Sequence, residues 1–284
     1  MFRQMFEEKY IRFPGGKTRA ITFSYDDGVE ADKKLVAILN KYGLKGTFNL
    51  NSSLFECKNW HNRMNEEETY NLFKDGVHEV ALHGARHIFM GKVPLPEALL
   101  ETVKCREYME RKYERIVRGH AYAYGYSEGV EEMLKSAGIL YARTTDPTYS
   151  FEIPKNFLRL NPTCHHRDKK FKELCDKFFE TSALDEFKHR EGRLFLVWGH
   201  SYEFDDDNNW ELMEELGKRA KNCKDLWCAT LGEICEYIEA YNNLVFSLDG
   251  ERVYNPSCIP VFLEIRGKTY EVKPGKTVVF ENDL

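Results

Sequence analysis

The feature that most constrains the fold is a short apolar run that ends in two acids. Residues 20–25 read Ala-Ile-Thr-Phe-Ser-Tyr, and Asp26, Asp27 and Gly28 follow directly. A β-branched and aromatic run bounded by glycines is typical of a buried strand. Side chains alternate along a strand, so one of the two acids can bind a metal while the other handles a proton. A plain Asp-Asp-Gly turn without function is the alternative, because such turns are common in soluble proteins.

Similar short runs recur along the chain, with helical patterns between them. Strands are expected at residues 46–50, 78–83, 116–123, 140–144, 157–160, 194–198 and 226–229. Repeated βα units favour a barrel or an open doubly wound sheet. From residue 243 the residues alternate, and Asp249-Gly250 and Arg266-Gly267 indicate hairpin turns. We therefore expect a main domain at 1–242 and a small antiparallel β extension at 243–284.

Composition limits the partners and the compartment. A chain of 284 residues can bury roughly 75% of its unfolded surface without a disulfide. The net charge of −5 gives no general attraction to nucleic acid. No apolar run has the length of a membrane span, and the first 13 residues lack the apolar core of a secretion signal. The eight cysteines form no Cys-x-x-Cys pair, so we expect a reducing cytoplasm.

The third expected strand ends in two histidines. His83 and His87 are four residues apart and can converge on one ion if the segment turns tightly. Two imidazoles and one carboxylate are the three-ligand set of an open catalytic zinc site. The fold expectation brings Asp26-Asp27 and His83/His87 to neighbouring strand ends. We therefore predict a divalent metal site there, with zinc favoured.

The strand at 194–198 adds a third titratable strand end. It is followed by Gly199 and His200. A single histidine beside Trp198 is more often a core residue than a functional one. Three strand ends that each carry polar, titratable residues favour a functional site instead.

Together these motifs resemble the polysaccharide deacetylases with the NodB-homology domain, in order, over about residues 20–239. The resemblance rests on Thr22–Gly28, on His83-Gly84-Ala85-Arg86-His87, on Ala121-Tyr122-Ala123-Tyr124-Gly125 and on Leu196–His200. It implies a distorted (β/α) barrel of about seven parallel strands. It also implies that Asp26 is the general base, that Asp27, His83 and His87 bind the metal, that His200 is the general acid, and that the backbone N–H of Tyr124 stabilises the oxyanion.

Three departures from the family pattern concern residues around the site. The family often opens its third motif with an arginine that pairs with the base, and here that position is Ala121. Arg159 is the favoured replacement, ahead of Arg118 and Arg143. The fourth motif, an acid thought to orient the catalytic histidine, has no clear match. Gly84 also stands where a small hydroxyl residue is usual.

Further residues are expected to contact substrate. Tyr202 and Glu203 follow a strand, where aromatic rings can stack on sugars and an acid can bind a hydroxyl. Trp198 is a further candidate, and Tyr122 belongs either to a sugar-stacking wall or to a core layer. Cys164-His165-His166 is favoured as a loop near the site over a second metal site.

The leading hypothesis is a metal-dependent hydrolase that removes acetyl groups, N- or O-linked, from a saccharide. Its expected partner is an acetylated saccharide, with no nucleic acid and no membrane. Hydrolysis of a small non-sugar amide or imide on the same barrel is one alternative. A non-catalytic carbohydrate-binding protein is another.

Overall fold

A curled parallel sheet forms the centre of the molecule in the computed structural model, which describes residues 8–57, 61–180 and 190–280. Seven strands follow one another in the order β6-β5-β4-β3-β2-β8-β7, and β9 pairs with the start of β2. The expected distorted (β/α) barrel of about seven strands is confirmed. Its strands are β2 Arg19–Asp26, β3 Gly46–Leu50, β4 Glu79–Leu82, β5 Gly119–Ala121, β6 Tyr141–Arg143, β7 Cys164–His165, β8 Arg193–Gly199 and β9 Leu226–Cys228.

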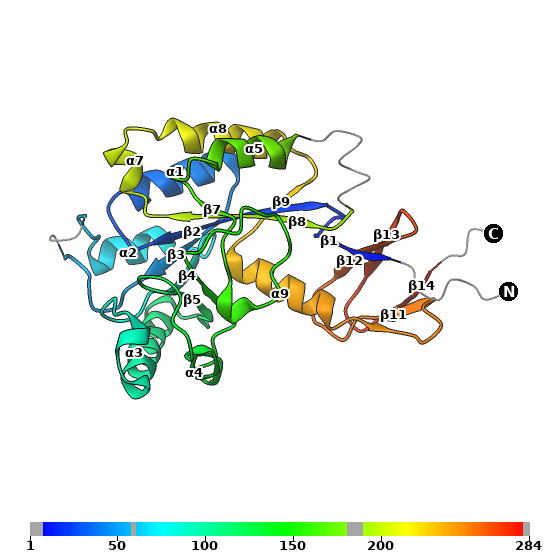
Figure 1. Ribbon diagram of the computed structural model, residues 1–284, viewed down its shortest axis with the longest axis horizontal. Helices are drawn as coiled ribbons and strands as arrows, with labels where there is room; N and C mark the ends of the chain where they lie inside the picture. The colour runs from blue at the N-terminus through cyan, green and yellow to red at the C-terminus, as the bar shows by residue number, and fades with distance from the viewer. Residues whose placement is uncertain (1–7, 58–60, 181–189, 281–284) are drawn as a thin grey trace.

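Helices between the strands cover the outside of the sheet. In Figure 1, α1, α5 and α8 form a layer on one side, while α3 and α4 lie on the opposite side of the view. None of the helices in the described ranges is long and apolar enough to cross a membrane. The helices are α1 Asp32–Tyr42, α2 Glu66–Phe73, α3 Leu95–Tyr113, α4 Glu131–Ser136, α5 Phe171–Phe179, α7 Glu203–Asp206, α8 Glu211–Asn222 and α9 Leu231–Asn242, with short 3-10 helices at Met90–Lys92 and Phe157–Arg159.

β2 is the central strand, and all eight of its residues are buried. It pairs with β8 along Arg19–Tyr25, with β9 at its start and with β3 at its end. A strand covered on both faces has no position that points to solvent, which explains the run of apolar and aromatic residues with few charges. Ile21, Phe23 and Tyr25 pack into the main core. The alternating residues Ser24 and Asp26 lie on the other face, so Asp26 is placed inside the barrel.

An irregular segment, residues 144–163, connects β6 to β7 and completes the wall of the barrel. The Leu160 N–H donates to Ala142 O, and the Thr163 N–H donates to Leu196 O, both at 2.9 Å. The strand expected at 157–160 is wrong, because residues Phe157–Arg159 form a 3-10 helix and only Leu160 bridges to Arg143.

Two small antiparallel sheets form the extension at the right-hand end of Figure 1, far from α2 and α7. The expected hairpin is present, because β12 and β13 pair across Arg266-Gly267, whose φ values are 55° and 75°. The expected division at residue 242 did not anticipate that β1, near the start of the chain, pairs with β12. The sheets are β1-β12-β13 and β10-β11-β14, with bounds β1 Lys9–Arg12, β10 Val245–Phe246, β11 Arg252–Tyr254, β12 Val261–Ile265, β13 Lys268–Val272 and β14 Thr277–Val279.

Candidate active site

A cleft of about 470 Å³ opens at the carboxyl ends of the parallel strands. Parallel strands present these ends at one edge, so residues that are far apart in the sequence meet there. All the expected site residues line this cleft except Arg159 and Glu203. The lining consists of Asp26, Asp27, His61, His83, His87, Tyr122, Tyr124, Thr145, Trp198, His200 and Tyr202.

The end of β2 separates the two acids by a sharp turn. Asp27 has φ 85° and Gly28 has φ 67°, and the Asp27 N–H donates to Asn49 O at 3.0 Å. Positive φ in a residue other than glycine costs about 1–3 kcal/mol and tends to occur at functional sites. His87 and Tyr124, at φ 58° and 62°, share this feature in the same cleft. The turn gives the two neighbouring carboxylates different partners, as the sequence suggested.

One oxygen of Asp26 is anchored while the other faces the histidines. Asp26 Oδ1 accepts hydrogen bonds from Arg143 Nη2 and, at 2.8 Å, from Asn49 Nδ2. Asp26 Oδ2 lies 3.8 Å from His83 Nε2. Burial raises the pKa of Asp26, but Arg143, His83 and His200 outweigh it and lower the pKa to about 2. The carboxylate therefore stays ionised at neutral pH.

Asp27 is held from behind by Arg63, which lies in the loop before α2. Arg63 Nη2 donates to Asp27 Oδ1 at 2.6 Å, and Arg63 Nη1 donates to Asp27 O and to Asn51 Oδ1. The Arg63 side chain is 2% exposed, so this is a buried, hydrogen-bonded ion pair. The fork fixes both the carboxylate and the strained backbone of Asp27.

The two histidines at the end of β4 face Asp27. His83 Nε2 and His87 Nε2 lie 3.9 and 3.7 Å from Asp27 Oδ1. His83 Nδ1 lies 2.9 Å from the carbonyl oxygen of Ala121. A carbonyl can only accept, so Nδ1 carries a proton, and Nε2, which faces Asp27, is the ring nitrogen that could bind an ion. The pKa of His87 is lowered to about 4 by burial and by His83, so the His87 ring is neutral at pH 7.

The backbone conformation explains why a glycine stands directly after His83. Gly84 has φ 77°, and a Cβ there would lie 3.4 Å from Glu101 Oε2. Glu101 is buried and accepts from the backbone N–H of Arg86 at 2.8 Å, which fixes the turn from His83 to His87. The departure from the small hydroxyl residue of the family therefore follows from the left-handed backbone at this position.

The donor set of Asp27, His83 and His87 fits a divalent ion. Their ligand atoms lie within 4.8 Å of one another. One carboxylate and two imidazoles match the oxygen and nitrogen ligands of catalytic zinc, and the Ala121 carbonyl supplies the outer contact that orients such a histidine. A second group of this composition, His165, His166 and Glu203, lies behind His200.

His200 projects from the end of β8 on the other side of Asp27. His200 Nε2 lies 3.9 Å from Asp27 Oδ2. Burial lowers its pKa, but contacts with Glu203, Asp26 and Asp27 outweigh burial, and the net effect raises the pKa of His200. Tyr202 stacks on His61 with ring centroids 3.5 Å apart, which forms an aromatic wall beside His200.

The opposite wall comes from the segment after β5. The Tyr124 ring meets the His87 ring edge-on at 4.7 Å and is 60% exposed. A Cβ at Gly125, which has φ 101°, would lie 2.9 Å from Thr145 Oγ1, so the motif needs glycine there. Tyr122 is 1% exposed and donates to Leu158 O at 2.8 Å. It therefore belongs to the core and also forms the floor of the cleft.

Two sequence expectations are corrected by these contacts. Arg159 does not reach Asp26, because its guanidinium lies over the Tyr126 ring at 4.4 Å. Arg143, ranked lower from the sequence, contacts Asp26 instead and also lies over the Trp198 ring at 4.6 Å. Glu203 does not line the cleft, because it is 7% exposed and its oxygens face three histidines.

Sequence reasoning missed Arg63 and Asn49 entirely. Asn49 follows the strand alternation of β3 and bonds both Ser24 Oγ and Asp26. An asparagine inside a fully buried strand was the available signal for it. Arg63 lies in a loop without a pattern, and nothing in the sequence pointed to it.

These features define the class of the protein as a (β/α) barrel with an acidic and histidine-lined cleft at its strand ends. Within that class, the model of the polysaccharide deacetylase family matches residues 9–142, which include Asp26, Asp27, His83 and His87. The resemblance to the polysaccharide deacetylase family is therefore confirmed over this part of the chain. No curated protein sequence matches the chain.

Solved structures share the fold at low sequence identity. A Mycobacterium smegmatis protein assigned to the polysaccharide deacetylases aligns with TM-score 0.61 and 17% identity, over 84% of this chain and 96% of its own. A Pseudomonas aeruginosa PAO1 protein assigned to the same group gives 0.59 and 13%, over 79% and 92%. Puue Allantoinase gives 0.57 and 12%, over 79% and 91%. At these identities the likeness shows the fold.

Proposed function

We propose that the protein is a metal-dependent hydrolase that removes acetyl groups from an acylated saccharide. The observation that carries this proposal is the meeting of Asp27, His83 and His87 in one cleft, with Asp26 and His200 on either side. The family match supports the deacetylase chemistry, and the aromatic wall of His61 and Tyr202 suits the face of a sugar ring.

Each residue has a task that its contacts support. A divalent ion, zinc being favoured, would be held by Asp27, His83 and His87 and, when bound, would polarise the acyl carbonyl and acidify water. Asp26, ionised and with Oδ2 facing the cleft, takes a proton from the attacking water. The backbone N–H of Tyr124 donates to the developing oxyanion. His200 protonates the leaving amine or alkoxide.

Exchanges at the two neighbouring aspartates test this proposal. Asp26→Asn should keep zinc bound and lower acetate release from N-acetylated chito-oligosaccharides by about 10²–10⁴-fold. Asp27→Asn should lose both zinc and activity, because it removes a charged ligand. Full activity in Asp26→Asn would overturn its role as the base. A zinc-loaded wild type that releases acetate from no acetylated sugar, N- or O-linked, would overturn the proposed function.

A small non-sugar amide or imide is the second candidate substrate class. Its support is the shared fold with the structure named Puue Allantoinase. Assaying cyclic amides beside acetylated sugars separates the two candidates by kcat/KM. The hypothesis of a non-catalytic protein rested mainly on the missing arginine of the third motif. Arg143 supplies an arginine beside Asp26, so that hypothesis loses support.

A further inference from the structure

A second group of titratable side chains lies directly behind His200. Glu203 Oε2 lies 3.1 Å from His165 Nε2 and 3.3 Å from His166 Nε2. The other oxygen, Oε1, lies 3.5 Å from His200 Nδ1. Two imidazoles and a carboxylate have the composition of a metal site, so that possibility comes first.

The hydrogen bonds of His165 argue against a metal in this group. The backbone N–H of Arg167 donates to His165 Nδ1 at 3.0 Å, so Nδ1 is the acceptor. In a neutral imidazole the proton is then on Nε2, which faces Glu203 and has no lone pair left for an ion. His83 shows the reverse arrangement, with its proton on Nδ1 toward Ala121 O. The partner of Nδ1 thus distinguishes the two groups. His83 keeps Nε2 available for a metal, whereas His165 uses Nε2 for hydrogen bonding.

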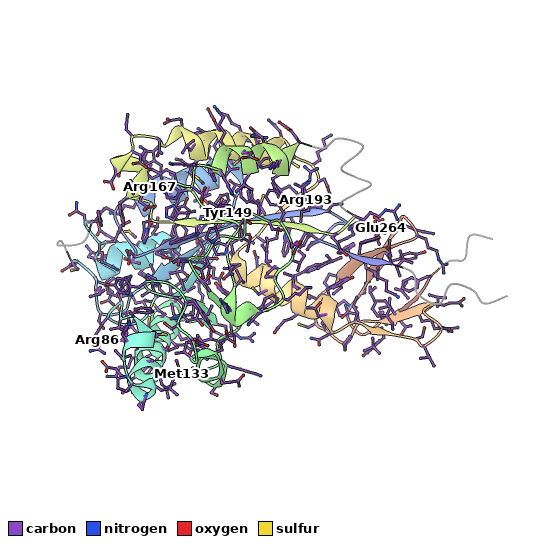
Figure 2. The ribbon with its side chains drawn as sticks, viewed as in Figure 1. Arg86, Met133, Tyr149, Arg167, Arg193 and Glu264 are labelled. Carbon is purple, nitrogen blue, oxygen red and sulfur yellow. The ribbon has the colours of Figure 1, made fainter. Side chains whose placement is uncertain are left out.

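Glu203 is held in place from several directions. His165 Nε2 lies 3.1 Å from Oε2, and the backbone N–H of His200 donates to the same oxygen at 3.0 Å. Arg167 Nη1 lies 3.3 Å from Oε1, and Figure 2 shows Arg167 beside α7. Burial raises the pKa of Glu203, but the contacts with His165 and His200 lower it well below its usual range. The result is a fixed, ionised carboxylate behind His200.

We propose that Glu203 is the positioning residue for His200, an inference that rests on the proposed function. A carboxylate can only accept, so Glu203 Oε1 favours the proton of His200 on Nδ1 and leaves Nε2 facing Asp27 and the cleft. At 3.5 Å the contact is longer than a good hydrogen bond, and such contacts shorten when substrate binds. Glu203 thus supplies, three residues after His200, the orienting acid for which the sequence offered no match.

This orientation matters at the step in which the leaving group departs. As the bond between the acyl carbon and the leaving nitrogen breaks, its electron pair stays on nitrogen and takes the proton of His200 Nε2. The imidazole that remains is neutral, and its other proton is on Nδ1 toward Glu203. A phenolate leaves without protonation, so an activated ester does not need this step.

The experiment compares a poor leaving group with a good one in the zinc-loaded enzyme. Glu203→Gln should lower kcat for an N-acetylated chito-oligosaccharide by about 10–100-fold with little change in KM. Its activity toward 4-nitrophenyl acetate should stay within about twofold of wild type, because that step needs no general acid. Zinc content should remain at one equivalent per chain. Nitrogen NMR of the labelled histidines should show loss of the Nδ1–H form of His200.

Control variants separate positioning from a structural role. Asp207→Asn removes the charge of the carboxylate to which Arg167 Nε and Nη2 donate but does not touch His200, so both activities should be unchanged. His200→Asn should show the same leaving-group pattern, and adding Glu203→Gln to it should cost little more. Glu203→Asp should recover part of the lost kcat if the shorter carboxylate reaches His200.

Other outcomes would overturn the inference. Equal losses on both substrates would indicate a structural role, and loss of a second zinc equivalent in Glu203→Gln would restore the metal alternative. An active wild type with an indistinguishable Glu203→Gln variant would refute this inference alone. A wild type inactive on every acetylated sugar would instead refute the proposed function.

Discussion

Arg143 is the residue that fixes Asp26 in the barrel interior. Its side chain is fully buried and contacts Asp26 Oδ1, Ser24 Oγ at 3.3 Å and the ring of Trp198. It lies on β6, at the edge of the sheet, four strands away from β2 in the strand order. The curl of the sheet brings the two residues together across the interior.

Replacing Arg143 should therefore destabilise the protein strongly. Arg143→Met leaves a buried, unpaired carboxylate and should lower the free energy of unfolding at pH 7 by about 3–5 kcal/mol. Arg159→Met, which loses only an exposed stacking contact, should change it by less than about 0.5 kcal/mol. Urea unfolding measures both, and similar losses in the two variants would contradict the assignment of Arg143.

The sign of the pH dependence follows from the pKa of Asp26. The folded pKa is about 2, below the value of about 3.9 expected for an unfolded chain. The Arg143 ion pair thus stabilises the folded state fully above about pH 4 and loses this effect as the pH falls toward 2. The difference in stability between wild type and Arg143→Met should shrink over the same range.

The strand-end residues of the site could be predicted because their motifs are local. Asp26, Asp27, His83 and His200 each follow a recognisable strand, and parallel strands bring these ends together. The residues that orient them could not be ranked from sequence. Arg143 reaches Asp26 only because the sheet curls, and Glu203 faces inward because α7 begins at Glu203, three residues after His200.

At the scale of elements, α9 is anchored by side chains near the amino ends of β3 and β4, at the end of the strands away from the cleft. The backbone N–H groups of Leu231 and Gly232 donate to Thr47 Oγ1 and Glu79 Oε2, at 2.9 and 2.8 Å. Thr47 in turn donates to Glu79. A buried acceptor at a helix N-terminus satisfies groups that the helix itself leaves without partners.

Exchanges at Glu79 test this anchor. Burial raises the pKa of Glu79, so the folded protein disfavours its charge and loses stability relative to a neutral residue as the pH rises. Glu79→Gln keeps an acceptor and should be near neutral at pH 7, whereas Glu79→Ala should cost about 1–3 kcal/mol. Glu236→Gln on the exposed face of α9 is the control. A Glu79→Ala variant as stable as the control would contradict the anchor.

Elements with a strong local pattern were predicted well, and those defined by distant pairing were not. The central strands and the β12–β13 hairpin follow from runs and turn residues. The segment at 157–160 resembles a strand in composition, but only Leu160 finds a partner there. The pairing of β1 with β12 spans almost the whole chain, and no local signal specifies it.

At the scale of the whole molecule, the extension is joined to the barrel through α9. Tyr237 Oη donates to Arg12 O on β1 and accepts from the Phe262 N–H on β12 at 2.8 Å. Arg12 is buried and pairs with Glu264 at 2.8 Å, among the extension strands where Figure 2 labels Glu264. One tyrosine of the barrel thus contacts both strands of the neighbouring sheet.

Tyr237→Phe should loosen the extension without changing catalysis. It removes the hydrogen-bond partner of the buried Arg12 carbonyl and of the partly buried Phe262 N–H, and should lower the free energy of unfolding by about 1–3 kcal/mol. Amide hydrogen exchange should quicken at β1 and β12. The kcat should stay constant, because the extension lies far from α7, which begins three residues after the cleft residue His200. Tyr241→Phe removes only a 3.4 Å hydrogen bond to Lys9 O and should cost less. A fall in kcat in Tyr237→Phe would mean that the extension influences the cleft, which the separation of the two ends argues against.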